Sequence, residues 1–148
     1  MLRNKTRLNK SILAGMLVVG IAVLGFAQVG EAEQGAGRVF FVSPADGATV
    51  TSPVSFEFGV EGLEISPVPE EVDQPRDDIG HYHIGFNTEC LPVGEELPQA
   101  DPWVHFGDGS STFESLLDPG EHTFAVQIGA DEHRTLEGLC DTITITVE

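Results

Sequence analysis

A period-two alternation of apolar and polar residues constrains this chain more than any other feature. In residues 141–147 isoleucine and valine alternate with threonine, and in residues 54–60 valine and phenylalanine alternate with serine, glutamate and glycine. Successive side chains of a β-strand point to opposite faces, so the alternation predicts strands with one face on a core. Because no stretch after residue 33 shows a convincing helical period, an all-β fold is expected.

About seven short strands are predicted after residue 37, separated by turn-forming Pro, Gly and Asp residues. They comprise residues 38–43, 54–60, 81–86, 103–106, 112–117, 121–129 and 141–147. Residues 61–78 are acidic and proline-containing, which predicts a long exposed loop. The pattern favours a single domain over residues 38–148, an antiparallel, immunoglobulin-like β-sandwich, with a small barrel as the alternative.

The N-terminus is typical of an export signal. Basic residues precede an uncharged apolar stretch at residues 11–27, and small residues follow it. This order indicates a secretory signal peptide, which we assign to residues 1–32. An uncleaved membrane anchor through residues 11–27 is the alternative. We therefore expect an exported protein, periplasmic or extracellular.

Two cysteines, Cys90 and Cys140, lie in the exported part of the chain. Their separation matches no CxxC redox pair or cysteine-based zinc motif. In an oxidising compartment we expect them to form one structural disulfide.

The charge balance excludes one class of function. The chain has 7 Lys and Arg residues against 24 Asp and Glu residues, for a net charge of −17. A surface this acidic repels phosphate backbones, which proteins bind through Lys and Arg. Nucleic acid is therefore not an expected partner.

Several motifs together carry a family resemblance. They are Gly80-His81-Tyr82-His83-Ile84, Leu91-Pro92-Val93-Gly94-Glu95, Val104-His105-Phe106-Gly107-Asp108-Gly109, Pro119-Gly120-Glu121-His122-Thr123 and Ile143-Thr144-Ile145-Thr146-Val147. With these motifs the chain resembles the bacterial domain-of-unknown-function family DUF4399, over most of residues 38–148. The resemblance implies a small exported protein with a histidine cluster and no agreed activity. Tyr82 and Trp103 stand where further histidines are common in the family, so a metal site of this family would have fewer histidines here.

Two histidines of one predicted strand suggest a metal site. His81 and His83 are two residues apart, so both imidazoles project from one face, about 6 to 7 Å apart at the backbone. Neutral imidazole is a common ligand for zinc and copper. The alternative is that both lie on a solvated outer face. If they bind metal, replacing both by alanine should leave the fold nearly intact, because both side chains point outward.

The remaining histidines extend this interpretation to different degrees. His105 precedes a Gly-Asp-Gly turn and could complete the site, or could be a hydrogen-bonded turn residue. His133 follows two carboxylates in a loop and is a candidate fourth ligand, or simply a solvated loop residue. His122 falls on the core side of its strand, where immunoglobulin-like folds often place a corner tyrosine, and we leave it out of the site.

No catalytic motif stands out. The chain lacks a GxSxG elbow, an HExxH helix, a glycine-rich phosphate loop and an EF-hand pattern. We therefore expect a non-catalytic module that binds a divalent metal, copper or zinc, through His81, His83, His105 and His133. The alternative is an immunoglobulin-like interaction or structural domain without metal, with a protein or glycan partner.

Overall fold

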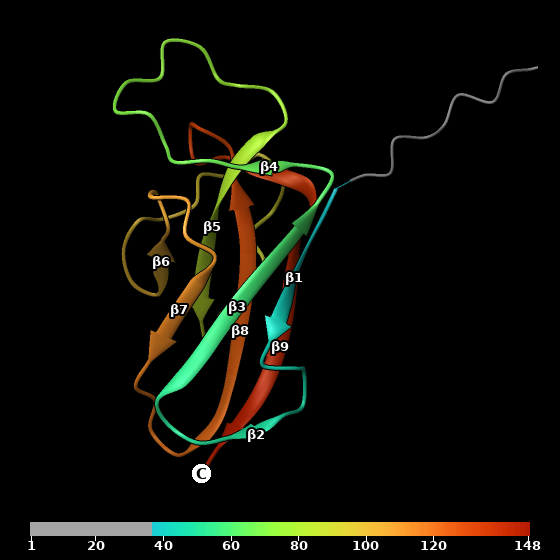
Figure 1. Ribbon diagram of the computed structural model, residues 1–148, viewed down its shortest axis with the longest axis vertical. Coiled ribbons are helices and arrows are strands. Elements are labelled where there is room, and N and C mark those ends of the chain that lie inside the picture. The colour runs from blue at the N-terminus through green and yellow to red at the C-terminus, as the bar shows by residue number, and fades with distance from the viewer. Residues whose placement is uncertain (1–36) are drawn as a thin grey trace, which may run out of the picture. The chain divides into compact units, whose positions relative to one another are not determined.

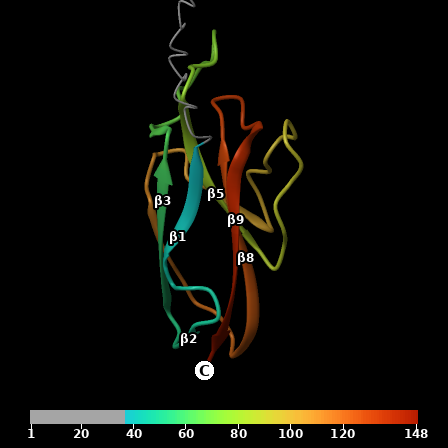
Figure 2. The same cartoon turned by 90° about the vertical axis from the view of Figure 1, so that its right-hand side faces the viewer.

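A computed structural model describes residues 37–148 of the chain. Over this range nine strands form two sheets that face each other in a sandwich-like arrangement, which Figure 2 shows edge-on. The described residues contain no helix, and hence none long and apolar enough to cross a membrane. The predicted signal peptide, residues 1–32, lies outside them.

The smaller sheet has three antiparallel strands in the order β1-β3-β7 (Figure 1). They are β1 (Arg38–Ser43), β3 (Val54–Glu61) and β7 (Thr112–Ser115). The central strand β3 follows the predicted alternation, because its Val54, Phe56 and Phe58 are buried while Ser55 and Glu57 are exposed. The all-β prediction is confirmed here.

The larger sheet has six strands. Its main path runs β2-β9-β8-β5-β4. Strand β6 lies off this path and pairs with β5. The strands are β2 (Thr49–Val50), β4 (Glu64–Ile65), β5 (Ile79–Phe86), β6 (Trp103–His105), β8 (Gly120–Gly129) and β9 (Thr135–Val147). The long strands β5, β8 and β9 therefore lie side by side and carry most of the sheet.

Three details of the strand prediction are wrong. The two-residue strands β2 and β4 were not predicted, and both pair in parallel, with β9 and β5 respectively. The sandwich is thus not wholly antiparallel, and residues 61–78 are not all loop. Strand β9 begins at Thr135, before the predicted start at residue 141. Strands as short as β2 and β4 show no period, so their pairing depends on which neighbour the tertiary fold supplies.

The core between the sheets is built from aromatic and β-branched side chains. Phe56 of β3 packs against Phe124 of β8 with ring centroids 4.8 Å apart. Phe58 lies 5.4 Å from the ring of Tyr82 and 5.5 Å from that of Phe106. Tyr82 points inward as predicted, so its neighbours in the chain must face the other way.

The outer face of the larger sheet has a cover of its own. Residues 87–102, here named the covering segment, lie over this face through a second small cluster of buried residues, Leu97, Trp103 and Ala125. Leu97 is 1% exposed. The outer face is therefore buried near the middle of β5 and β8.

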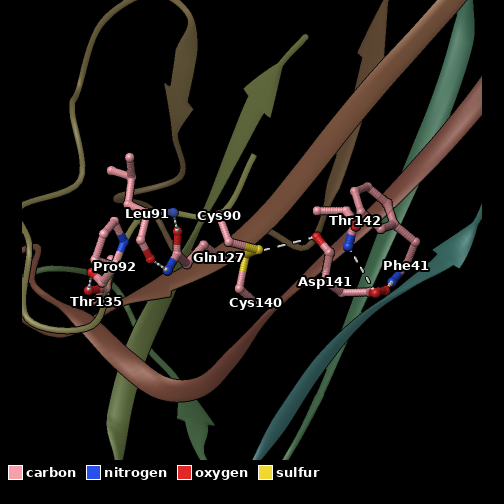
Figure 3. Close-up of a disulfide and its surroundings, with 9 residues drawn as sticks. All are labelled: Phe41, Cys90, Leu91, Pro92, Gln127, Thr135, Cys140, Asp141 and Thr142. Carbon is pink, nitrogen blue, oxygen red and sulfur yellow. Dashed lines mark hydrogen bonds between the residues drawn. A yellow bond between two sulfur atoms is a disulfide. The ribbon is translucent and has the colours of Figure 1, made fainter. Parts of the chain in front are cut away.

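Several bonds attach the covering segment to the larger sheet (Figure 3). The predicted disulfide joins Cys90 to Cys140 of β9. Next to it, the side-chain amide of Gln127 donates to the Leu91 carbonyl oxygen and accepts from the Leu91 N–H, both at 2.9 Å. The Thr135 hydroxyl donates to the Pro92 carbonyl oxygen at 2.6 Å. The segment is thus held covalently at one end and by hydrogen bonds along its length.

Replacing Phe56 by alanine tests the core. The ring is 1% exposed and contacts aromatic side chains of both sheets, so we expect a loss of about 3–5 kcal/mol in the free energy of unfolding. Urea denaturation of Phe56→Ala and of the exposed-site control Glu57→Ala measures it. Equal stabilities of the two variants would contradict the assignment of this face to the core.

Candidate metal centre

The two histidines of β5 are buried on the outer face of the larger sheet. Tyr82 and Ile84 fill the core, and His81 and His83, which alternate with them, are each 0% exposed. The alternative that both lie on a solvated face is wrong, because the covering segment lies over them. The expectation that their removal leaves the fold nearly intact rested on that exposure and no longer follows.

Two further histidines come from other parts of the chain. His105, at the end of β6, is the direct cross-strand partner of His83. His133 lies in the turn between β8 and β9 with a φ of 60°, a left-handed conformation uncommon outside glycine. Its N–H donates to Ala130 and its carbonyl oxygen accepts from Leu97, both at 2.7 Å. The structure therefore holds a strained backbone in place beside the β5 histidines.

These four residues form one cluster. Each offers a ring nitrogen, and the four nitrogens all lie within 4.8 Å of one another. The closest pairs are His81 Nε2 to His83 Nε2 at 2.9 Å and His105 Nε2 to His133 Nε2 at 3.1 Å. The sequence analysis named all four, and the structure brings all four together.

The hydrogen bonds define the tautomer of His83. Its Nδ1 lies 3.3 Å from the Pro98 carbonyl oxygen, which can only accept, so Nδ1 carries the proton. Neutral His83 then presents a lone pair at Nε2, and His81 donates its Nε2 proton to it. His81 Nδ1 is left buried with no hydrogen-bond partner. An unsatisfied buried polar atom costs about 1–3 kcal/mol, so this arrangement is not optimised for stability.

The rings surround a common point. The centroids of His81, His83 and His105 are 4.8 to 4.9 Å apart in all three pairs. The centroid of His133 is 4.8 Å from those of His81 and His105 and 5.7 Å from that of His83. All six separations are therefore similar.

Two glycines leave the space that these rings occupy. A Cβ on Gly107 would overlap the ring of His105, and a Cβ on Gly129 would lie 3.2 Å from His83 Nε2. Neither glycine has a positive φ. The His105 ring therefore disfavours a side chain at position 107, and a side chain at position 129 would crowd His83 and Leu97. The surroundings of the cluster fit the four rings closely.

Burial keeps the central histidines uncharged. Desolvation, with repulsion from the neighbouring imidazoles as a smaller cause, lowers the pKa of His81 to about 4 and that of His83 to about 3. Desolvation also lowers the pKa of the half-buried His105. At neutral pH these rings are in the form that coordinates metal ions.

An ion pair between half-buried Arg76 and buried Asp131 supports the turn that carries His133. The Asp131 side chain is 1% exposed and accepts from Nε and Nη2 of Arg76 at 2.9 and 2.7 Å. These hydrogen bonds lower the pKa of Asp131, which stays ionised within electrostatic reach of His81. Arg76 also bonds Ser66 and Pro67. The acidic loop is thereby tied to the same turn as the covering segment.

His122 lies apart from the cluster, as predicted. Its ring stacks on Phe124, and its Nε2 lies 2.9 Å from the Asp118 carbonyl oxygen, four residues upstream. The ring belongs to the β7–β8 corner and has a packing role.

Sequence reasoning missed the residues that support the cluster. Arg76, Gly107 and Gly129 were not assigned roles, and Asp131 was considered only as one of the carboxylates that could join His133 as a ligand group. A histidine two residues after Asp131 and a glycine two residues after His105 were visible signals, but neither spacing reveals a contact across strands. Those contacts depend on the pairing of β5 with β6 and β8.

Together these features define a disulfide-linked, all-β protein with a cluster of four histidines on the covered face of one sheet. The chain matches the sequence model of the family described as domain of unknown function (DUF4399) over residues 56–148, and it belongs to that family. The match includes all four histidines. Neither the curated proteins nor the solved structures include a significant match.

Removing the disulfide should destabilise the fold. In the chain-entropy model a loop of 50 residues contributes about 4 kcal/mol. We therefore expect Cys90→Ser/Cys140→Ser to unfold at lower urea concentration, with faster amide exchange in the covering segment. A change of the unfolding free energy below about 1 kcal/mol would contradict a restraining role.

Acidification should destabilise the metal-free protein. Below pH 6.5 the unfolded chain takes up protons at His81 and His83, whereas the folded chain does so only near pH 4 and 3. Stability therefore falls as the pH drops from 7 to 5, by up to about tenfold in the folding equilibrium per pH unit for each histidine. Urea denaturation after treatment with a chelator measures this.

The variant His83→Gln provides the control for this pH dependence. It removes one of the two buried imidazoles, so it should reduce the slope of stability against pH by about half. A wild-type stability that is unchanged between pH 7 and 5 would contradict the neutral, buried state of these histidines.

Proposed function

We propose that this protein is an exported, non-catalytic metal-binding module that holds one divalent ion, copper or zinc, in the four-histidine cluster. One observation carries the proposal, namely four ring nitrogens within 4.8 Å of one another. Structural zinc sites have four protein ligands at about 2.0–2.1 Å for histidine nitrogen. The cluster supplies that number of ligands without large movement of the backbone.

The state of the apo cluster supports the same function. His81 and His83 are neutral at physiological pH, so no proton has to leave an imidazolium before coordination. The buried, unpartnered His81 Nδ1 indicates that the packing here serves something other than stability. Gly107 and Gly129 provide the space for the rings.

The cluster leaves no open coordination position for a substrate, which favours metal binding without catalysis. A catalytic zinc site keeps an open position for water or substrate, with three protein ligands. Four histidines fill a tetrahedral shell, and His81 and His83 are fully buried. We therefore expect no hydrolytic or other enzymatic activity from this cluster.

The disulfide supports the proposed compartment. Disulfides persist in oxidising environments outside the cytosol, and Cys90–Cys140 is formed in the fold. This agrees with export to the periplasm or the extracellular space, where the module would receive or deliver its ion. A protein partner for that exchange is part of the proposal.

A second candidate is an immunoglobulin-like interaction or structural domain without metal. The contact of His122 with the Asp118 carbonyl favours it, because a tyrosine corner in such folds makes the same kind of bond to the backbone a few residues upstream. The disulfide differs from the inter-sheet bridge of antibody domains, since it joins the larger sheet to its own cover. This candidate does not account for the clustered histidines.

Titration calorimetry of the purified, chelator-treated protein with Zn²⁺ and Cu²⁺ near pH 7.5 tests the proposal. We expect one ion per chain at submicromolar affinity. Replacing His105 by alanine should weaken binding by about 100-fold or more, because a ligand is lost from a shell of four. His105 is half-buried, so this variant should fold.

His122→Ala is the matched control. It removes a histidine outside the cluster and should leave stoichiometry and affinity unchanged. Loss of affinity in both variants alike, or weak binding without stoichiometry in the wild type, would overturn the metal-binding function in favour of the second candidate.

A further inference from the structure

The geometry points to a tetrahedral d¹⁰ cation, Zn²⁺ or Cu⁺, as the ion of the four-histidine cluster, with discrimination against square-planar Cu²⁺. This inference rests on the proposed metal-binding function, specifies the coordination geometry of the ion, and includes monovalent Cu⁺ in addition to the divalent ions named there. It comes from the arrangement of the four rings and not from the number of ligands.

The centroids of the four rings do not lie in one plane. Four centroids at the corners of a square would have diagonals about 1.4 times the sides. Here the longest of the six separations is 5.7 Å and the shortest is 4.8 Å, a ratio of about 1.2. The rings therefore stand at the corners of a slightly distorted tetrahedron.

The tetrahedron of ring centroids also has the size that imidazole coordination requires. An imidazole bound at about 2.0 Å has its centroid about 3.2 Å from the metal, which places tetrahedral neighbours about 5.2 Å apart. A square-planar shell would instead need opposite rings about 6.4 Å apart. The observed range, 4.8 to 5.7 Å, surrounds the tetrahedral value and stays below the square-planar one.

The backbone around the cluster opposes movement of the four rings into one plane. His81 and His83 come from one strand, and His105 is fixed beside His83 by β-pairing. His133 is held by hydrogen bonds to Ala130 and Leu97 and lies in a turn whose buried Asp131 pairs with Arg76. The protein therefore resists the geometry that Cu²⁺ prefers.

The donor set and its surroundings agree with this class of ion. All four candidate ligands are imidazoles, which suit zinc and copper and offer no carboxylate for a hard cation. Asp131, the buried carboxylate near His81, is already paired with Arg76. The four-histidine cluster thus selects its ion through its shape and its nitrogen donors, and its ligands carry no negative charge.

Co²⁺ serves as the spectroscopic probe of the shell. In the chelator-treated protein it should give the intense visible absorption of a tetrahedral complex, and Zn²⁺ should displace it. His133→Ala, which leaves three imidazoles and open positions, should give the weak bands of a higher-coordinate ion. His122→Ala should behave as the wild type does.

A competition experiment measures the discrimination. Unconstrained nitrogen sites bind Cu²⁺ more tightly than Zn²⁺. We expect the preference for Cu²⁺ over Zn²⁺ to be at least about tenfold smaller in the wild type than in His133→Ala, since the variant frees the shell to become planar. Titration of Cu⁺ under reducing conditions against a Cu⁺ chelator, with Zn²⁺ as competitor, then identifies which d¹⁰ ion binds more tightly.

The outcomes distinguish a failure of the tetrahedral assignment from a failure of the metal-binding function. Intense Co²⁺ bands with a reduced Cu²⁺ preference support the inference. Stoichiometric binding with weak Co²⁺ bands, or with the Cu²⁺ preference equal to that of His133→Ala, overturns the tetrahedral assignment and leaves the metal-binding function intact. No stoichiometric binding of any of these ions overturns both.

Discussion

The attachment of the covering segment to β8 and β9 is the interaction on which the cluster depends. Without it, β5 would present His81 and His83 to water, as the outer face of a two-layer sandwich normally does. The disulfide and the Gln127 amide hold the start of the segment against the sheet (Figure 3). From there Leu97 and Pro98 reach His133 and His83. The outer face of β5, which would otherwise be exposed to solvent, is thereby buried.

Burying polar rings in this way has a cost that the fold does not recover locally. One ring nitrogen of His81 has no partner, and His133 adopts a left-handed backbone. In an ordinary core, buried polar atoms have partners and the backbone is unstrained. Departures of both kinds are typical of functional sites. Coordination of an ion by the ring nitrogens would offset such costs, because metal binding contributes to the free energy of folding.

The few basic residues of the described domain are used for structure. Arg38 pairs with Glu61 across β1 and β3, and Arg76 pairs with Asp131 beside the cluster. Arg134 donates to the Gly94 carbonyl oxygen of the covering segment. Two of these three arginines therefore hold loops against the turn of His133, which leaves the acidic excess to face the solvent. Such a surface attracts cations toward the domain.

The sequence by itself determined the longer strands, the disulfide and the identity of the four candidate ligands, but not the short strands β2 and β4. Alternation defined which face of each long strand meets the core, because the period of two is a property of the local backbone. The same alternation placed Tyr82 inward and His81 and His83 outward. It could not show that the outward face is covered, since that depends on contacts with residues 87–102.

Only the tertiary structure decided the burial of the cluster, its tetrahedral arrangement and its supporting residues. His133 joins His81 because β8 and β9 form a hairpin whose turn lies over β5, and His105 joins His83 through strand register. Gly107, Gly129 and the Arg76–Asp131 pair contribute through contacts between segments distant in sequence. No local period encodes such contacts, because they arise only when separate strands are packed together.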